Sequence, residues 1–183
     1  MPTDALRPPV TPEAVPITDS RLQEAYRYWL DKCDGDALPT RRDLDPADIP
    51  KLLPHVLLVE VHGDGRYRYR LVGTENVYEH GMDATGRYLD EVLPGPEYRA
   101  HVLRLYDECV RERRPVYSES LFLSAVGLKP ERHLKVLFMP LSNDGERVNL
   151  VFVVQRFFYV DHGVRQRHFL DAPPHREIIH AAL

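Results

Sequence analysis

A pair of short segments joined by a glycine turn most constrains the fold of this chain. Residues 55–62 (HVLLVEVH) are rich in apolar and β-branched side chains, and residues 66–72 (RYRYRLV) alternate between arginines and apolar or aromatic side chains. The link Gly63-Asp64-Gly65 is typical of a turn between antiparallel strands. We therefore predict two antiparallel strands, with the tyrosines of the second strand on one face and its arginines on the other.

Two longer segments have the apolar period of a helix. Residues 20–34 carry one apolar stripe that ends before Gly35, and Ser20 and Gln23 have the spacing of a capping box at its start. Residues 96–113 carry a second stripe, with an acidic residue at the start and arginines at the end, which suits the helix dipole. A helix with a single apolar stripe must pack against another surface.

The order of the elements indicates an α+β domain. Residues 74–93 hold short apolar groups separated by glycines, which favours short helical turns over one long helix. Strands are expected at 116–124, 134–141 and 148–158, with a tight turn at 143–145. Two strands, then helices, then three strands predict an antiparallel sheet with helices on one face.

The two ends of the chain differ from this central part. Residues 1–17 contain five prolines, so we expect an extended or disordered arm. Residues 158–183 are polar and rich in histidine, with a short helix expected around Glu177–Ala182. The domain between them spans 18–157. Because no output module follows the domain, we expect any signal to leave by contact with another protein.

Composition narrows the class of protein. The chain of 183 residues has 24 Lys and Arg against 28 Asp and Glu, a net charge of −4, which argues against coating a nucleic acid. It has neither an apolar run of about 18 residues nor the pattern of a secretory signal. Two cysteines do not indicate a disulfide framework. We expect a cytoplasmic protein with no nucleic-acid or membrane partner.

The order of elements and one local motif resemble the PAS domain family. The second strand ends in residues 71–74 (LVGT), a helix is expected at 75–80, and residues 81–89 (GMDATGRYL) resemble the glycine-arginine phrase that closes this part of PAS domains. Residues 38–46 (LPTRRDLDP) resemble short, stand-alone PAS-like proteins of alphaproteobacteria. The resemblance covers about residues 20–157.

This resemblance implies a particular sheet and a class of function. PAS domains have a five-stranded antiparallel sheet in the order 2-1-5-4-3, with helices that enclose a pocket on one face. They sense small molecules, light or redox state, or they pair with other proteins, and most are not catalytic. We therefore expect a non-catalytic sensor or adaptor domain in signal transduction, which binds a small apolar ligand, a protein partner or both.

The pocket walls are expected on the inward side of the strands and on the long helix. The alternative is plain core packing with no cavity. The residues predicted to line the pocket are Tyr69, Leu71, Val77, Tyr78, Met82, Val102, Leu105, Tyr106, Phe122 and Met139.

The second face of the sheet also needs a cover, because residues 150–154 are almost all apolar. The first helix can supply it, from the same chain or from a second copy. We predict a homodimer, with coverage within one chain as the alternative. The predicted interface residues are Leu22, Tyr26, Trp29, Cys33, Val151 and Val153.

The cysteines and histidines are the residues that could hold a cofactor or a metal. Cys33 and Cys109 lie on apolar stripes, as buried thiols do, and no flavin-adduct motif is found. His101 lies on the long helix, where some PAS proteins place a haem ligand, but away from the centre of the stripe. We expect neither haem nor flavin, while an unidentified small molecule stays open. The spacing of the tail histidines is irregular for zinc, so no metal is expected: His162, His168, His175 and His180.

Two other classes of function stay open. One is an enzyme on a cone-like α+β fold, which would need a buried pair of carboxylates or histidines in the pocket. The other is a structural dimer module with a filled core. No nucleophile elbow or glycine-rich phosphate loop occurs, so we predict no catalytic residue.

Overall fold

The structure is a computed structural model that describes residues 17–123, 130–159 and 175–183. Of these, residues 122, 123, 130, 131 and 175–179 are described by their backbone alone. The predicted arm therefore lies outside the described residues, except for Ile17, which is buried. No helix in the described part of the chain has the length and apolar character that crossing a membrane requires.

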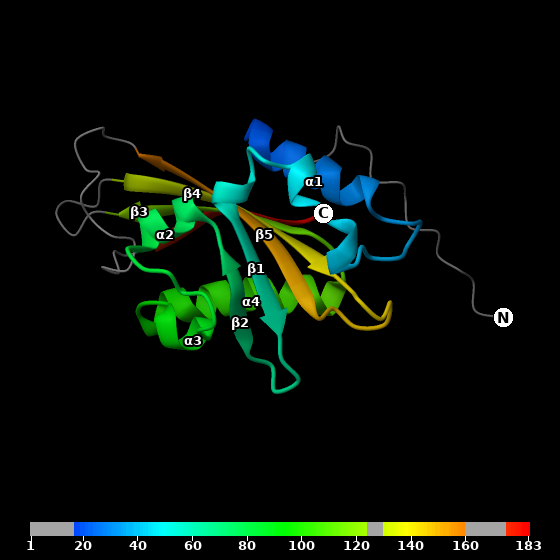
Figure 1. Cartoon of the computed structure of the whole chain (residues 1–183). Helices are drawn as coiled ribbons and strands as arrows, with labels where there is room; N and C mark the ends of the chain where they lie inside the picture. The colour runs from blue at the N-terminus through cyan, green and yellow to red at the C-terminus, as the bar shows by residue number, and fades with distance from the viewer. Residues whose placement is uncertain (1–16, 124–129, 160–174) are drawn as a thin grey trace.

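One antiparallel sheet forms the centre of the molecule, with strand order β2-β1-β5-β4-β3-β6 (Figure 1). Its first five strands follow the predicted PAS order, and β6 adds a sixth. The predicted α+β class and PAS fold are confirmed. The strands are β1 (Val56–Val61), β2 (Tyr67–Val72), β3 (Val116–Leu123), β4 (Pro130–Leu141), β5 (Leu150–Tyr159) and β6 (His175–Ala182).

The helix predicted around Glu177–Ala182 is wrong, because this segment forms β6. It pairs antiparallel with β3, from Val116 opposite Ala182 to Phe122 opposite His175. Without β6, β3 would present a row of unpaired amide and carbonyl groups at the sheet edge. Pairing with a distant strand therefore decided the conformation of this short segment, over its local helical tendency.

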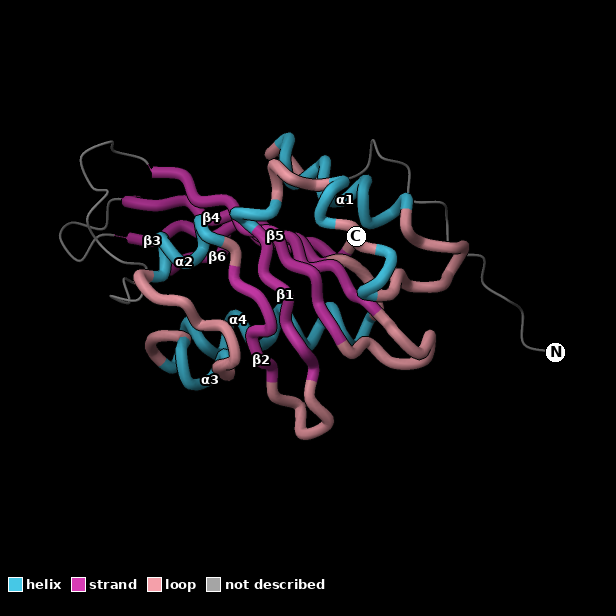
Figure 2. Tube along the Cα trace, viewed as in Figure 1, coloured by secondary structure: helices cyan, strands magenta, loops and turns pink. Residues whose placement is uncertain are grey.

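Helices cover both faces of the sheet (Figure 2). On one side lie the second, third and fourth helices, and on the other lie the first helix and three short 3₁₀ turns. The helices are α1 (Ser20–Asp31), α2 (Thr74–His80), α3 (Leu89–Val92) and α4 (Pro96–Glu112), and the 3₁₀ turns are η2 (Arg41–Asp43), η3 (Pro46–Asp48) and η4 (Leu53–His55).

The start of α1 differs from the prediction. Asp19 is the N-cap, and its carboxylate accepts hydrogen bonds from the backbone amides of Arg21 and Leu22, both at 3.0 Å. The predicted capping box of Ser20 and Gln23 is wrong. A carboxylate at this position satisfies two amides and suits the positive end of the helix dipole, which favours Asp19 over Ser20.

Two separate apolar cores hold the layers together. The α4-side core lies between the sheet and α3 and α4, and the α1-side core lies between the sheet and α1 with the 3₁₀ turns. The predicted stripe of α1 is buried in the α1-side core, where Leu22 is 0% and Trp29 is 4% exposed. The second face of the sheet is therefore covered by the same chain.

Candidate functional site

A small cavity lies between α4 and the sheet, on the side of the α4-side core. Its free space is about 20 Å³, enough for about one water molecule. The cavity joins elements that are far apart in the sequence: β2, α2, α4, β3, β4 and β5. Its lining residues are Tyr69, His80, Leu93, Tyr98, His101, Val102, Leu105, Tyr106, Ser118, Ser120, Leu134, Val136, Phe138 and Gln155.

The register of the sheet builds the floor of this cavity. In β3 and β4, Ser118 lies opposite Val136 and Ser120 opposite Leu134. On its other side, Val136 lies opposite Gln155 of β5. Because side chains alternate along a strand, these residues all face α4, and their neighbours face α1.

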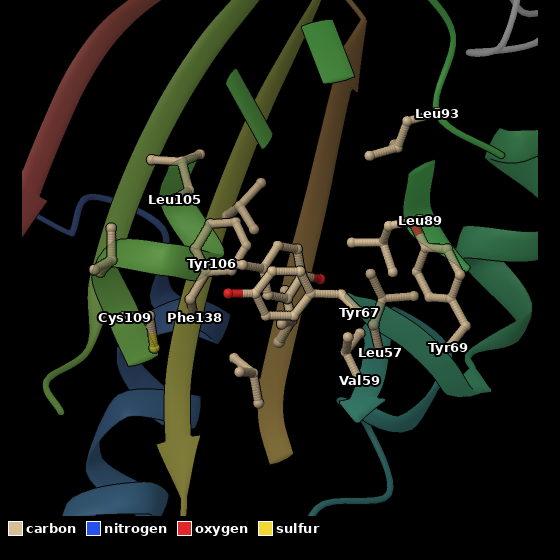
Figure 3. Close-up of a cluster of buried hydrophobic side chains, with 14 of the residues drawn as sticks. Leu57, Val59, Tyr67, Tyr69, Leu89, Leu93, Leu105, Tyr106, Cys109 and Phe138 are labelled. Carbon is tan, nitrogen blue, oxygen red and sulfur yellow. The ribbon is translucent and has the colours of Figure 1, made fainter. Parts of the chain in front are cut away.

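Tyrosine rings form the wall between β2 and α4 (Figure 3). The ring of Tyr106 lies 5.0 Å from that of Tyr67 and 4.9 Å from that of Phe138, measured between ring centres. Burial raises the pKa of Tyr69 and Tyr106 above the ordinary value of a phenol. These hydroxyls therefore stay protonated at physiological pH and serve as neutral hydrogen-bonding groups.

The cavity also holds a buried imidazole and an amide, both uncharged. His80 is 4% exposed, and burial lowers its pKa to about 4, so its imidazole is uncharged near pH 7. The Oε1 atom of Gln155 is buried and accepts no hydrogen bond from the described residues. Together with Ser120, these groups can donate to and accept from a small polar ligand. No cluster of three or more metal-ligating side chains occurs in the part of the chain that the structure describes.

The structure brings four of the ten predicted pocket residues to the cavity: Tyr69, Val102, Leu105 and Tyr106. Val77 and Met82 are half-buried but do not line it, and Tyr78 is 62% exposed on α2. The side chain of Phe122 lies outside the described residues.

Leu71 and Met139 lie on the wrong side of the sheet for the predicted pocket. Met139 follows Phe138 in β4, so alternation turns it into the α1-side core. Leu71 is displaced by a bulge: Tyr69 pairs with Val59, but Leu71 pairs with Leu58, which leaves Arg70 as an extra residue. The bulge reverses the alternation of β2, and Leu71 is left 43% exposed on the α1 side.

The residues predicted for a dimer interface are occupied within one chain. Leu22, Tyr26 and Trp29 pack on the sheet in the α1-side core, and half-buried Cys33 packs against that core. Val151 and Val153 belong to the α4-side core and are 0% exposed. Five of these residues are thus buried within one chain and Cys33 is half-buried, and a homodimer through this surface stays a prediction.

The sequence analysis missed the polar side of the cavity. Ser118 and Ser120 alternate with the larger side chains of β3, and Gln155 ends the apolar run of β5. Small hydroxyls at alternate positions of a buried strand were the one available signal, because they leave space next to a helix. His80 gave no such signal, since its burial depends on how α2 lies across the sheet.

A second hollow lies on the other side of the sheet, beside the 3₁₀ turns. It has about 60 Å³ of free space and an apolar lining. Two leucines at this hollow are exposed, Leu53 at 36% and Leu71 at 43%. The residues that line it are Arg41, Leu44, Pro46, Ile49, Leu53, Val56, Leu58, Leu71 and Phe152.

The start of α2 connects these two hollows. The amide of Gly73, which caps α2, donates to the carbonyl oxygen of Val56 at 2.7 Å, and the side chain of Asn76 donates to the same oxygen at 3.2 Å. Val56 follows η4 directly and lines the second hollow, while His80 at the end of α2 lines the cavity. Helix α2 therefore contacts Val56 of the second hollow at its start and contributes His80 to the cavity at its end.

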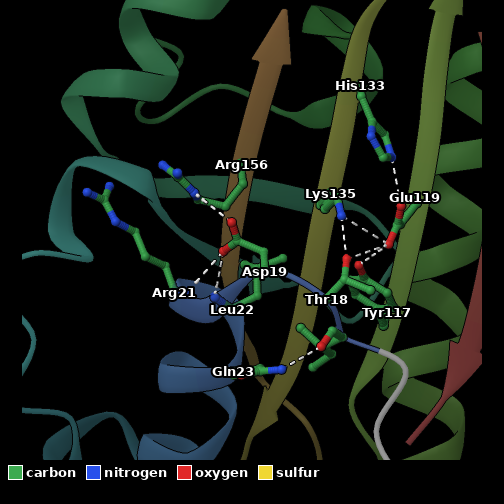
Figure 4. A network of polar contacts seen from close by, with 11 residues as sticks. Thr18, Asp19, Arg21, Leu22, Gln23, Tyr117, Glu119, His133, Lys135 and Arg156 are labelled. Atoms are coloured by element: carbon green, nitrogen blue, oxygen red, sulfur yellow. Dashed lines mark hydrogen bonds and ion pairs between the residues drawn. The ribbon is translucent and has the colours of Figure 1, made fainter.

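A polar network on the α1 side is separate from the cavity (Figure 4). Glu119 of β3 is 3% exposed, and its carboxylate lies 2.7 Å from Nε2 of His133 and 3.5 Å from Nζ of Lys135. The hydroxyl of Tyr117 donates to the same carboxylate, and Thr18 contacts it from the segment before α1. This network fastens the start of α1 to β3 and β4.

Comparison with known proteins agrees with this architecture. A family model described as a PAS domain matches residues 17–154, which is most of the chain and runs from before α1 into β5. No curated protein matches the sequence. The chain belongs to the PAS domain family.

Proposed function

We propose that this chain is a non-catalytic sensor whose small ligand binds in the cavity between α4 and the sheet. PAS domains are sensory and signalling modules and generally do not catalyse reactions. The observation that supports this most is the composition of that cavity, in which tyrosine rings and apolar side chains surround neutral polar groups such as Ser120 and Gln155. Such a lining suits recognition of a small molecule. A hydrolytic or acid–base site would instead call for a paired acid and base.

The cavity must widen to admit a ligand, because its free space is about 20 Å³. The elements at its rim suit such a change. Helix α2 has 7 residues and ends at Gly81 in the left-handed region, and α3 has 4 residues. Short elements with few packing partners open at lower free energy than a central strand. A ligand that stabilises the opened form would shift the population toward it.

The widening also provides a route for the signal. Movement of α2 displaces Val56 and η4 through the bonds of Gly73 and Asn76, and so alters the apolar surface around Leu53 and Leu71. We propose that this change is passed on by contact with another protein chain, either a second copy or a signalling partner.

Native mass spectrometry of the purified full chain tests the ligand site. Val102 is half-buried and lines the cavity, so Val102→Trp fills it, whereas Val110→Trp adds the same bulk two turns further along α4 at a half-buried position outside the cavity. We expect a retained small molecule in the wild type and in Val110→Trp, and its loss in Val102→Trp. Equal retention by both variants, or no retained molecule in any of the three, would overturn the proposal.

A further inference from the structure

Arg132 on β4 is a buried cation with no counterion among the side chains that the structure describes. The residue is 3% exposed, and its Nε and Nη1 atoms are buried with no hydrogen-bond partner. No salt bridge joins it to a carboxylate of the described residues. Its guanidinium carbon lies 5.7 Å from the centre of the ring of Tyr159.

The position of Arg132 in the sheet places it at one end of the cavity. It lies two residues before Leu134 on β4, about 7 Å along the strand, and so faces the same side of the sheet as the lining residues Leu134 and Val136. In the register it lies opposite Tyr159 of β5. In the next row, Phe157 contacts His80 of α2. Arg132 therefore lies beside the α2 end of the cavity.

The acidic residue at this end is engaged elsewhere. The hydroxyl of Tyr159 donates to the carboxylate of Glu79, which α2 holds at 4% exposure. Burial, followed by this hydrogen bond, raises the pKa of Tyr159, so the phenol keeps its proton. Glu79 thus fixes the tyrosine against which the arginine lies.

A buried guanidinium cannot relieve its isolation by losing its proton, because its intrinsic pKa is too high. Burial without a counterion is costly, so proteins place an anion beside such a group. The group best suited to the flat fork of an arginine is a carboxylate, which accepts two parallel hydrogen bonds. A single cation also favours an anion with one charge over a doubly charged phosphate.

We propose that the cavity binds a small organic monocarboxylate, with the carboxylate on Arg132 and the apolar part among Tyr69, Leu105 and Val136. This inference rests on the proposed function and names the class of its ligand. A monocarboxylate also matches both parts of this side of the sheet, since Arg132 provides a charged end and the cavity provides an apolar middle for one amphipathic molecule.

Titration calorimetry with a matched series of probes tests this inference. The probes are the straight-chain carboxylates from acetate to octanoate and the corresponding primary amides. We expect at least one acid to bind the wild type at least tenfold more tightly than its amide, and to bind Arg132→Met at least tenfold more weakly. Arg70→Met is the matched control. Arg70 is an exposed arginine on the edge strand β2 and pairs with Glu60 of β1, so this substitution should leave acid binding unchanged.

The outcomes separate this inference from the proposed function. If amides bind as tightly as acids, or if Arg132→Met keeps the wild-type affinity, the cavity still binds ligands but the inference is wrong. If no acid and no amide binds, the inference fails, and the native mass spectra of the Val102→Trp and Val110→Trp variants decide the proposed function on their own.

Unfolding of the ligand-free protein gives a second measurement. Because Arg132→Met removes an uncompensated buried charge and keeps an apolar side chain of similar length, the urea midpoint of the variant should equal or exceed that of the wild type. A lower midpoint would show that Arg132 is a structural cation with a partner in the free protein, and would overturn the inference.

Discussion

The indole nitrogen of Trp29 donates a hydrogen bond of 3.0 Å to the carbonyl oxygen of Pro140, and both groups are buried. Because Trp29 lies on α1 and Pro140 on β4, this bond fastens the first helix to the sheet of its own chain. It is the polar centre of the α1-side core, which is otherwise apolar around the indole.

Trp29→Phe should destabilise the fold, because it leaves the buried carbonyl of Pro140 without its donor. The expected loss in the free energy of unfolding is about 1–3 kcal/mol. Urea denaturation followed by far-UV circular dichroism measures it. Tyr78→Phe is the control, since Tyr78 is 62% exposed and should change the midpoint little. An unchanged midpoint for Trp29→Phe would mean that this hydrogen bond contributes little to stability.

Gly73→Ala should also destabilise the fold, for a steric reason. A Cβ atom at Gly73 would lie 2.4 Å from the carbonyl oxygen of Leu53 and 2.5 Å from that of Pro54, and backbone atoms cannot move aside easily. The expected cost is roughly 1–3 kcal/mol. Gly63→Ala is the matched control, because no atom lies within 4 Å of the added carbon. Equal urea midpoints for the two variants would contradict the close approach of α2 to η4.

His55 should make stability fall in mild acid. Its Nε2 atom lies 2.8 Å from Nη1 of Arg21 and 2.9 Å from Nη1 of Arg156, with Asp19 nearby. Burial, and then the charges of the two arginines, lower its pKa to about 4, against 6.5 for an ordinary histidine. Between these two pH values the unfolded chain binds a proton that the folded chain does not. The stabilising effect is therefore complete above pH 6.5 and is lost as the pH falls toward 4.

Urea unfolding of His55→Gln at pH 7, 6, 5 and 4.5 checks this expectation. The glutamine keeps an acceptor for the arginines but does not titrate, so the decline in the free energy of unfolding should be shallower by roughly 1–3 kcal/mol over this range. Burial also lowers the pKa of His80 to about 4, so His80 contributes to the decline in the free energy of unfolding in both the wild type and the variant. Parallel pH profiles for wild type and variant would show that His55 titrates normally.

Glu119→Gln should weaken the attachment of α1. Burial acts to raise the pKa of Glu119, but the hydrogen bond from Tyr117 and the charges of Lys135 and His133 outweigh it and lower the pKa. The ionised carboxylate thus stabilises the fold above about pH 4.5, and this effect is lost as the pH falls through the lowered pKa. At pH 7 the variant should lose roughly 1–3 kcal/mol.

Denaturation of Glu119→Gln at two pH values tests this directly. The difference from the wild type should be largest near pH 7 and should shrink below pH 4, where the wild-type carboxyl also becomes protonated. Hydrogen exchange of the amides at the start of α1 should rise in the variant at pH 7. A difference that is the same at both pH values would assign the effect to packing and not to charge.

The local sequence pattern correctly predicted the elements whose conformation depends on residues close by in the chain. The hairpin of β1 and β2 follows from alternation and the turn at Gly63-Asp64-Gly65, and α4 begins at Pro96 as its proline and apolar stripe predict. Four predicted residues line the cavity because they lie on faces that these periods define. The resemblance to PAS domains supplied the order of the first five strands, which no local pattern contains.

Contacts between distant segments decided the features of the fold that the sequence pattern predicted wrongly or left open. One extra residue, Arg70, reversed the alternation of β2 and moved Leu71 to the opposite face, and pairing with β3 turned a short expected helix into β6. The choice between cover by the same chain and cover by a second copy came from the packing of α1 on β4 and β5. By itself, the sequence determined which segments have a face to bury, because periodicity is a local property. Only the tertiary structure decided what each face is buried against, because that depends on the register and packing of segments that lie far apart in the chain.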